Sequence, residues 1–196
     1  MSAIWIIDFG SQYTQLITRK TRELDFHSVI LTVEDAKEKL LAGQKPMAII
    51  LSGGPQSVFE DTEDYTPFFQ LEIPILGICY GMQLMAKYYG GTVEKGTIGE
   101  YGKSEVIVEP ELSLPFKKFT AWMSHSDHVS VIPGDFKVVI KSDNGLIAGI
   151  QHTKLPRLGL QFHPEVHHTE KGAEVLSYFF KEVSKLEENW KTGDMH

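Results

Sequence analysis

The feature that most constrains the fold is the alternation, along the first half of the chain, of short apolar runs with segments of helical period. This alternation is typical of βα units that build a mostly parallel sheet. The predicted strands are Ala3–Ile7, His27–Val33, Met47–Leu51 and Pro74–Ile78, and the predicted helices are Tyr13–Leu24, Glu34–Ala42 and Met82–Tyr89. We therefore expect an α/β protein with an open, mostly parallel central sheet flanked by helices.

The second half of the chain has a different texture, with many short β-like stretches and few helical segments. These stretches include Ser104–Val108, Phe136–Ser142, Leu146–Gln151 and Leu158–Phe162. We interpret them as antiparallel additions to the sheet. An amphipathic helix is predicted at Lys171–Leu186, followed by a polar end. The expected organisation is one domain over residues 1–186 and a tail over residues 187–196.

Charge and the first residues limit the classes of partner. The formal net charge of −7 argues against binding to nucleic acid, because that affinity comes from clustered lysine and arginine. The N-terminal apolar run is Ala3–Ile7, far shorter than a signal-peptide core or a membrane span. We expect a cytoplasmic protein whose partners include neither nucleic acid nor a membrane.

The sequence contains one cysteine, Cys79, which can form neither an internal disulfide nor a zinc site with other cysteines. It lies in Gly77-Ile78-Cys79-Tyr80-Gly81, between an apolar strand and a helix. A G-x-C-x-G sequence in that context predicts a nucleophile elbow, in which small residues relieve the crowding of a sharp turn. The turn would expose the sulfur above the sheet at a helix N-terminus, which favours the thiolate. The alternative is a buried structural cysteine.

A nucleophilic cysteine needs a base and a group that orients the base, and His163-Pro164-Glu165 can supply both. On an extended backbone, residues two apart project to the same side, so His163 and Glu165 could both face Cys79. The pair follows an apolar strand, as Cys79 does. Sites in open α/β sheets lie at the edge where the carboxyl ends of the parallel strands meet. The sequence therefore predicts a Cys79, His163 and Glu165 triad, although several histidines must be ordinary surface residues.

Acyl transfer also requires donors for the tetrahedral oxyanion. The backbone N–H of Tyr80, directly after the cysteine, is one expected donor, and the Gly53-Gly54 turn at the end of a neighbouring strand can supply another. We expect that this loop needs glycine because its backbone takes unusual dihedral angles. The alternatives are an ordinary glycine loop and a phosphate-binding loop; the second is disfavoured because Ser52–Ser57 lacks an aspartate and contains a proline.

Several separate stretches together resemble the class I glutamine amidotransferases, over nearly the whole chain. They are Asp8–Tyr13, Ser52–Pro55, Gly77–Gln83, Met123–Asp127 and Phe162–Val166. The elbow and the His-Pro-Glu sequence are common to the class, and no triad position departs from it. The opening Asp8–Tyr13 stretch and His167-His168-Thr169 resemble the GMP synthetase branch. The resemblance implies a flavodoxin-like α/β fold.

The resemblance also implies an activity and a binding site. In the family, the residue matching Cys79 attacks the side-chain amide of L-glutamine, and glutamate and ammonia are released. The resemblance assigns the oxyanion hole to Gly54 and Tyr80. It assigns recognition of the glutamine α-amino and α-carboxylate groups to Gln83, Ser124, Ser126 and Asp127. Judged without the family, Gln83 would be a helix surface residue and the other three a polar turn.

The resemblance implies a partner as well. The GMP synthetase branch uses ammonia in an ATP pyrophosphatase domain that converts XMP to GMP with ATP and magnesium. No such domain is present in these residues, so we expect this chain to hold no cofactor and no metal, and to be an excised domain or a separate subunit. Its glutaminase activity is expected to be weak or latent when it is alone.

Three other functions compete with this one. The chain could serve another amidotransferase pathway, such as anthranilate or aminodeoxychorismate synthesis. It could be a non-catalytic regulatory protein of the same fold, which the intact set of Cys79, His163 and Glu165 disfavours. A peptidase relative is the third alternative, and the implied pocket for a free amino acid disfavours it.

Overall fold

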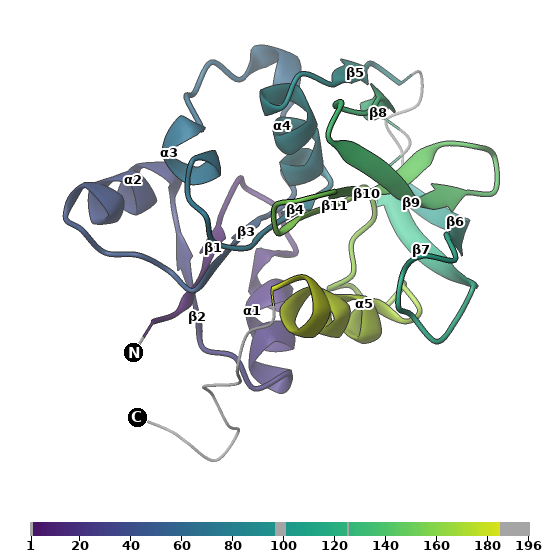
Figure 1. The fold of residues 1–196 in the computed structure, drawn as a ribbon, viewed down its shortest axis with the longest axis horizontal. Helices are drawn as coiled ribbons and strands as arrows, with labels where there is room; N and C mark the ends of the chain where they lie inside the picture. Colours follow the sequence, from purple (N-terminus) through teal and green to yellow (C-terminus); the bar gives the residue numbers. More distant parts are fainter. Residues whose placement is uncertain (1, 97–100, 125, 185–196) are drawn as a thin grey trace.

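The computed structural model describes residues 2–96, 101–124 and 126–184. Figure 1 shows a central sheet with helices on both faces. The sheet has nine strands in the order β2-β1-β3-β4-β11-β10-β9-β6-β7. The parallel strands are β1 (Ile4–Ile7), β2 (Ser28–Leu31), β3 (Ala48–Leu51), β4 (Ile75–Ile78) and β11 (Arg157–Leu160). The predicted parallel centre of the sheet is confirmed.

The other four strands extend the sheet in antiparallel fashion. They are β6 (Tyr101–Val108), β7 (Lys118–Ser124), β9 (Phe136–Ser142) and β10 (Ile147–His152). A separate antiparallel pair joins β5 (Thr92–Glu94) to β8 (His128–Val131). The predicted antiparallel additions in the second half are therefore confirmed, and the fold is the open α/β sheet that the sequence predicts.

Helices cover both faces of the parallel part (Figure 1). On one face lie α1 (Thr14–Glu23) and α5 (Gly172–Tyr178), and on the other lie α2 (Val33–Leu41), α3 (Thr66–Phe69) and α4 (Tyr80–Tyr88). In β1, Ile4 and Ile6 pack into the core on the α1 and α5 face, whereas Trp5 and Ile7 pack into the opposite core. Because both faces are buried, the strand is apolar at every position.

The register of the central strands brings three loops together. Within the sheet, β4 lies between β3 and β11, with Leu51 beside Gly77 and Leu160 beside Ile78. Since the three strands are parallel and end level, the residues that follow them emerge at the same edge. These residues are the glycine loop after β3, Cys79 after β4 and the segment leading to His163 after β11.

Some elements differ from the prediction. The helix predicted at Lys171–Leu186 is α-helical only as far as Tyr178, where α5 ends, and a π-helical stretch continues directly over Phe179–Val183; residues 185 and 186 and the predicted tail lie outside the described residues. Helix α4 begins at Tyr80, two residues before the predicted start, because it starts directly at the turn. Strands β5, β7 and β8 and helix α3 were not predicted.

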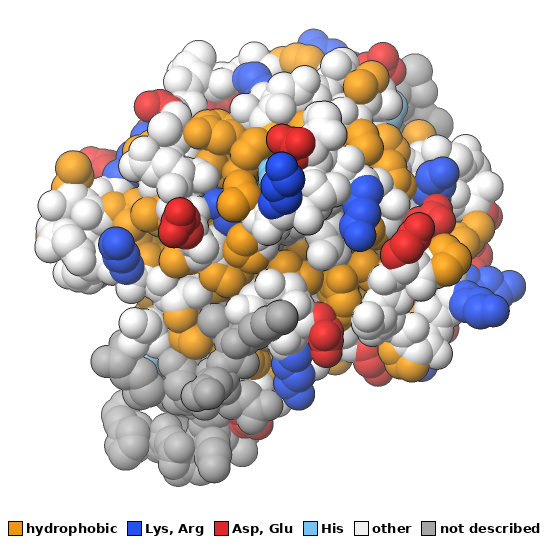
Figure 2. All heavy atoms as spheres, in the orientation of Figure 1, with side chains coloured by type: hydrophobic (Ala, Val, Ile, Leu, Met, Phe, Trp, Pro, Cys, Tyr) orange, Lys and Arg blue, Asp and Glu red, His pale blue; other side chains and the backbone are white. Residues whose placement is uncertain are grey.

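The molecular surface on the side seen in Figure 2 carries charges of both signs, with lysine and arginine side chains scattered among acidic ones. Within residues 2–96, 101–124 and 126–184, no helix is both long enough and apolar enough to cross a membrane.

Candidate active site

A sharp turn between β4 and α4 positions Cys79. The residue has φ 54° and ψ −106°, and its N–H donates to the carbonyl of Leu160 at 2.6 Å. The two flanking glycines are required by space, because a Cβ at Gly77 would lie 2.6 Å from the backbone of Gly81. A Cβ at Gly81 would lie 2.2 Å from the carbonyl oxygen of Leu51. The packing of strand against helix therefore permits only glycine at both positions, as the predicted elbow requires.

The imidazole of His163 and the carboxylate of Glu165 form a buried pair. The distance between His163 Nδ1 and Glu165 Oε2 is 3.0 Å, and both side chains are almost fully buried. The expected backbone conformation is wrong, because Pro164 and Glu165 lie in a turn and not on an extended segment. The turn folds the carboxylate back onto the imidazole ring, so Glu165 bonds to His163 and not to Cys79.

Backbone contacts from β7 and from the following turn fix His163. Its N–H donates to the carbonyl of Trp122 at 2.9 Å, and its own carbonyl accepts the hydroxyl of Thr169 at 2.6 Å. Thr169 Oγ1 also accepts the N–H of Trp122 at 2.9 Å. Strand β7, in the antiparallel part of the sheet, therefore helps to hold His163, which follows the parallel strand β11.

The environment of His163 favours its charged form. Burial by itself lowers the pKa of His163, but the negative charge of Glu165 and the hydrogen bond to Cys79 outweigh burial and raise the pKa to about 10. The geometry places the two side chains next to each other, since a Cβ built on Gly53 would lie 3.5 Å from His163 Nε2 and 3.7 Å from Cys79 Cβ. At neutral pH the pair therefore holds an imidazolium beside Cys79, a group that can donate a proton to a leaving amine.

Cys79 opens onto a cavity of about 240 Å³. The cavity is lined by Gly54, Pro55, Gln56, Cys79, Tyr80, Gln83, Ser124, Ser126 and Asp127. It includes every residue predicted for the oxyanion hole and for glutamine binding. One expectation is corrected: Cys79 is buried, with 5% of its surface exposed, because the cavity walls enclose the sulfur that the elbow presents. The volume is below the roughly 300–1,000 Å³ of sites for drug-sized ligands, which fits a ligand as small as an amino acid.

Polar groups in this cavity are tied to one another. Gln83 Nε2 donates to the backbone carbonyl of Asp127 at 2.9 Å, and the hydroxyls of Ser124 and Ser126 lie 2.6 Å apart. Gln83 is buried and not a helix surface residue, because α4 packs on the sheet with this face inward. His125 lies outside the described residues. These contacts hold the donors and acceptors on one wall of the cavity.

The reason for glycine in the Gly53-Gly54 turn differs from the expected one. Neither residue has a positive φ, so the loop needs no unusual dihedral angle. Space is the constraint: a Cβ at Gly53 would lie 2.8 Å from His163 Cε1, and a Cβ at Gly54 would lie 2.6 Å from the carbonyl oxygen of Phe9. Glycine therefore lets the loop after β3 approach the imidazole closely.

Two polar residues that were not predicted lie beside the predicted ones. The buried Gln161 directs its amide Nε2 toward Cys79 Sγ at 3.6 Å, and Ser57 Oγ donates to Asp127 Oδ2 at 2.7 Å. Gln161 lies two positions before His163, and this closeness in sequence is the signal that could have identified it as a site residue. Ser57 lies at the end of the loop that follows the two glycines, and no sequence signal marks it.

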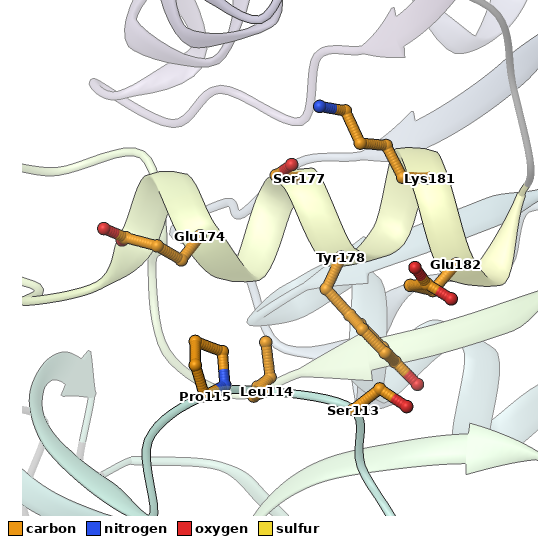
Figure 3. Close-up of a pocket in the computed structure, with 8 residues that line it drawn as sticks. All are labelled: Ser113, Leu114, Pro115, Glu174, Ser177, Tyr178, Lys181 and Glu182. Atoms are coloured by element: carbon orange, nitrogen blue, oxygen red, sulfur yellow. The ribbon is translucent and has the colours of Figure 1, made fainter.

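Another cavity, of about 250 Å³, lies between α5 and the segment 113–115 (Figure 3). It contains none of the predicted site residues. Among the residues with described positions, no group of three or more histidine, cysteine, aspartate or glutamate side chains could hold a metal ion.

An open α/β sheet with a cysteine at a strand-to-helix turn and a histidine–carboxylate pair beside it is the arrangement of cysteine-dependent acyl-transfer enzymes. The chain belongs to the class I glutamine amidotransferase family, whose model, described as "Glutamine amidotransferase class-I", matches residues 5–183.

Curated relatives resemble the chain over nearly its full length. A GMP synthase (glutamine-hydrolyzing) from Thermosipho melanesiensis is 44% identical over 99% of this chain, and the one from Thermosipho africanus gives the same values. The GMP synthase from Schizosaccharomyces pombe is 41% identical over 95% of it. The chain spans 38% of the length of the two Thermosipho proteins.

Solved structures share the fold. The crystal structure of a protein from Thermoplasma acidophilum, assigned as one subunit of a GMP synthase, superposes with a TM-score of 0.79 at 30% identity, covering 91% of this chain and 92% of that one. A glutamine amidotransferase from Thermotoga maritima gives a TM-score of 0.63 at 22% identity, over 95% of this chain and 86% of the other, and supports the fold alone.

Proposed function

We propose that this chain hydrolyses L-glutamine to glutamate and ammonia through a thioester on Cys79. The observation that carries the proposal is the buried pair of Glu165 and His163 next to Cys79, at the edge of a polar cavity of amino-acid size. Membership of the amidotransferase family supports the same reaction. The catalytic residues are Cys79, His163 and Glu165.

The reaction proceeds in two halves. The Cys79 thiolate attacks the side-chain amide carbon, and the resulting oxyanion accepts hydrogen bonds from the backbone N–H groups of Tyr80 and Gly54. The C–N bond then breaks, the nitrogen takes a proton from His163, and ammonia leaves the thioester. In the second half, His163 accepts a proton from water, whose oxygen attacks the thioester carbon, and glutamate leaves as the sulfur regains its charge.

Recognition of a free amino acid falls to the polar wall of the cavity. Asp127 pairs with the α-amino group, since it is a carboxylate at the cavity surface whose position Ser57 fixes. Gln83, Ser124 and Ser126 supply donors and acceptors for the remaining groups of glutamine. A peptide lacks a free amino and carboxyl group at one residue, so this wall favours glutamine over a protein substrate.

The ammonia is used by a synthetase. The similarity to proteins named GMP synthase, of which this chain spans 38%, supports pairing with an ATP pyrophosphatase domain or subunit, in which ATP and magnesium activate XMP for conversion to GMP. The amidotransferase domain comprises residues 1–186, and residues 187–196 begin the connection to that partner. The site of action is the cytoplasm.

The first test combines labelling with activity. A glutamine-analogue electrophile, diazo-oxo-norleucine, is applied to the wild type, Cys79→Ala and His163→Ala, and the labelled peptide is found by mass spectrometry. His167→Ala is the matched control, because that histidine is exposed. We expect labelling at Cys79 in the wild type and the control, and none in Cys79→Ala.

Glutamate release is then measured with and without a GMP synthase pyrophosphatase domain, ATP, magnesium and XMP. We expect a slow rate for the chain alone and a higher rate with the partner. Absence of labelling and of glutamate release under every condition would refute the proposal in favour of a non-catalytic protein. Stimulation only by an anthranilate or aminodeoxychorismate synthase would assign the chain to that pathway.

A further inference from the structure

Asp61, in the loop between β3 and α3, has a carboxylate enclosed by donors. Its Oδ2 accepts hydrogen bonds from the hydroxyls of Tyr65, at 2.5 Å, and of Tyr80, and its Oδ1 accepts the N–H of Glu63 at 2.9 Å. Partial burial alone would raise the pKa of Asp61, but the two tyrosine hydroxyls outweigh it and hold the pKa below its ordinary value. The group is therefore a fixed anion at neutral pH.

Asp61 does not line the cavity that contains Cys79. It lines a different cavity, on the outer side of α4 beside Leu84 and Lys87. Both carboxylate oxygens are already occupied by protein donors. Asp61 can therefore reach the reaction only through the residues that it holds.

The first of those residues is Tyr80, which directly follows Cys79 and begins α4. Its side chain is buried, and its hydroxyl is anchored on Asp61. Its backbone N–H belongs to the first turn of the helix, where no partner within the helix is available. Anchoring the far end of the side chain fixes the position of this N–H relative to Cys79.

Phe9 extends the same cluster to the other proposed donor. Its ring packs against the ring of Tyr80, with centroids 5.2 Å apart, and against that of Tyr65, at 6.0 Å. Its carbonyl oxygen lies so close to Gly54 that a Cβ there would be 2.6 Å away, and its N–H donates to Ser52 Oγ. The Phe9 backbone thus lies against the glycine turn.

We propose that Asp61 is a positioning residue for the oxyanion hole, because it anchors Tyr80 directly and, through the Phe9 ring, supports the backbone of Gly54. The inference rests on the proposed glutaminase function. Oxyanion donors act only at about 2.7–3.1 Å from the developing charge. A small displacement of either N–H therefore reduces stabilisation of the transition state more than it reduces binding of the substrate. Loss of the anchor should therefore lower kcat and leave KM nearly unchanged.

The test uses Asp61→Asn and Tyr80→Phe, with Asp64→Asn as the matched control. Asp64 lies in the same loop and lines the same outer cavity, but it is exposed and contacts neither tyrosine hydroxyl. Tyr80→Phe removes a single oxygen atom, so it keeps the test informative if Asp61→Asn unfolds. Each protein is assayed for glutamate release with the synthetase domain and its substrates present.

A second readout separates positioning from general damage. Iodoacetamide alkylates a thiolate by forming a C–S bond as the C–I bond breaks and iodide leaves, so no oxyanion forms. We expect kcat for glutamine to fall by about 10-fold or more in Asp61→Asn and Tyr80→Phe, with the alkylation rate of Cys79 and KM within about two-fold of wild type. The kcat of the double variant should be no lower than that of the less active single variant, since both changes remove the same anchor.

The inference is overturned if folded Asp61→Asn matches Asp64→Asn in kcat, if Tyr80→Phe does so when Asp61→Asn fails to fold, or if alkylation falls in parallel with kcat. The last result would mean that the cluster supports the whole site and not the oxyanion donors. A wild-type protein that releases no glutamate under any condition refutes the glutaminase proposal itself, whereas an active wild type with an unaffected Asp61→Asn variant refutes only the role of Asp61.

Discussion

At the scale of the residue, the charge of His163 links the site to stability. Its pKa is raised from an ordinary 6.5 to about 10 in the folded protein, so between these values the folded state binds more protons than the unfolded state. The stabilisation is fully present below pH 6.5 and is lost as the pH rises toward about 10. We expect the free energy of unfolding to fall across this window, by at most about 1.4 kcal/mol per pH unit for one proton.

Urea unfolding at several pH values checks this expectation in the wild type and in Glu165→Gln. Without the carboxylate, the largest influence that raises the pKa of His163 is lost, so the fall in unfolding free energy across this window should become smaller or disappear. Glu174→Gln, on the exposed side of α5, is the control and should keep the wild-type slope. Equal slopes in all three proteins would show that Glu165 does not hold the charge on His163.

Local sequence could predict the residues of the site only in part. Cys79 and His163 stand out because glycines and strand ends mark them, and the cavity contains the residues predicted for the oxyanion hole and for glutamine binding. Asp61 has no such mark and bonds to Tyr80 from 19 positions away. Gln161 directly follows β11, but its partner Cys79 lies 82 positions away, so the sequence does not reveal the contact. Contacts of this kind depend on the completed fold and leave no periodic pattern in the chain.

At the scale of the element, the approach of α4 to β3 leads to a prediction about Gly81. A Cβ in Gly81→Ala would lie 2.2 Å from the Leu51 carbonyl, and backbone on both sides cannot yield without moving the elbow. We expect a loss of roughly 3 kcal/mol or more in unfolding free energy, the upper end for overpacking, together with loss of Cys79 labelling. Denaturant titration measures the first and mass spectrometry the second.

The control for this change is Gly134→Ala, where a Cβ meets nothing within 4 Å and φ is not positive. That variant should stay close to wild type in both measurements. If Gly81→Ala were equally mild, the elbow would tolerate a wider separation of strand and helix than its packing indicates.

Arg157, at the start of β11, leads to another prediction for these elements. The buried guanidinium donates to the carbonyls of Phe69 at 3.1 Å, Leu71 at 2.5 Å and Ile73 at 2.6 Å, and to the hydroxyl of Tyr89 at 3.1 Å. Arg157→Met would leave these acceptors buried without their donor and should lower the unfolding free energy by about 2–5 kcal/mol. Thermal and urea unfolding, with the exposed Lys154→Met as control, test it; equal stability of the two variants would contradict it.

Elements were predictable where burial determines the sequence. The parallel strands are apolar at nearly every position, and the predicted and observed bounds differ by a few residues at most. Strand β7 was not predicted because its apolar run is short: it begins with Lys118, is interrupted by Thr120 and ends with Ser124. Helix α3 has four residues, which are too few to show a helical periodicity in the sequence.

At the scale of the whole molecule, the described core lies within the domain that we propose. The last buried residue of the core is Phe180, and the family model ends at residue 183. We expect deletion of residues 187–196 to leave the unfolding midpoint unchanged within about 1 °C. Calorimetry of both forms measures it, with a deletion from residue 172 onward as the destabilised comparison. A large drop on the shorter deletion would place residues 187–196 inside the domain.

The neighbouring positions of β4 and β11 in the sheet also have a consequence for protein synthesis. Cys79 leaves the ribosome long before the chain that follows β11, and four antiparallel strands and the β5–β8 pair are made in between. Because domains acquire distant contacts only once both partners have been translated, a nascent chain carries the cysteine without its histidine. If Cys79 and His163 act as we propose, an unfinished polypeptide does not hydrolyse glutamine, and activity begins only when synthesis of this domain is nearly complete.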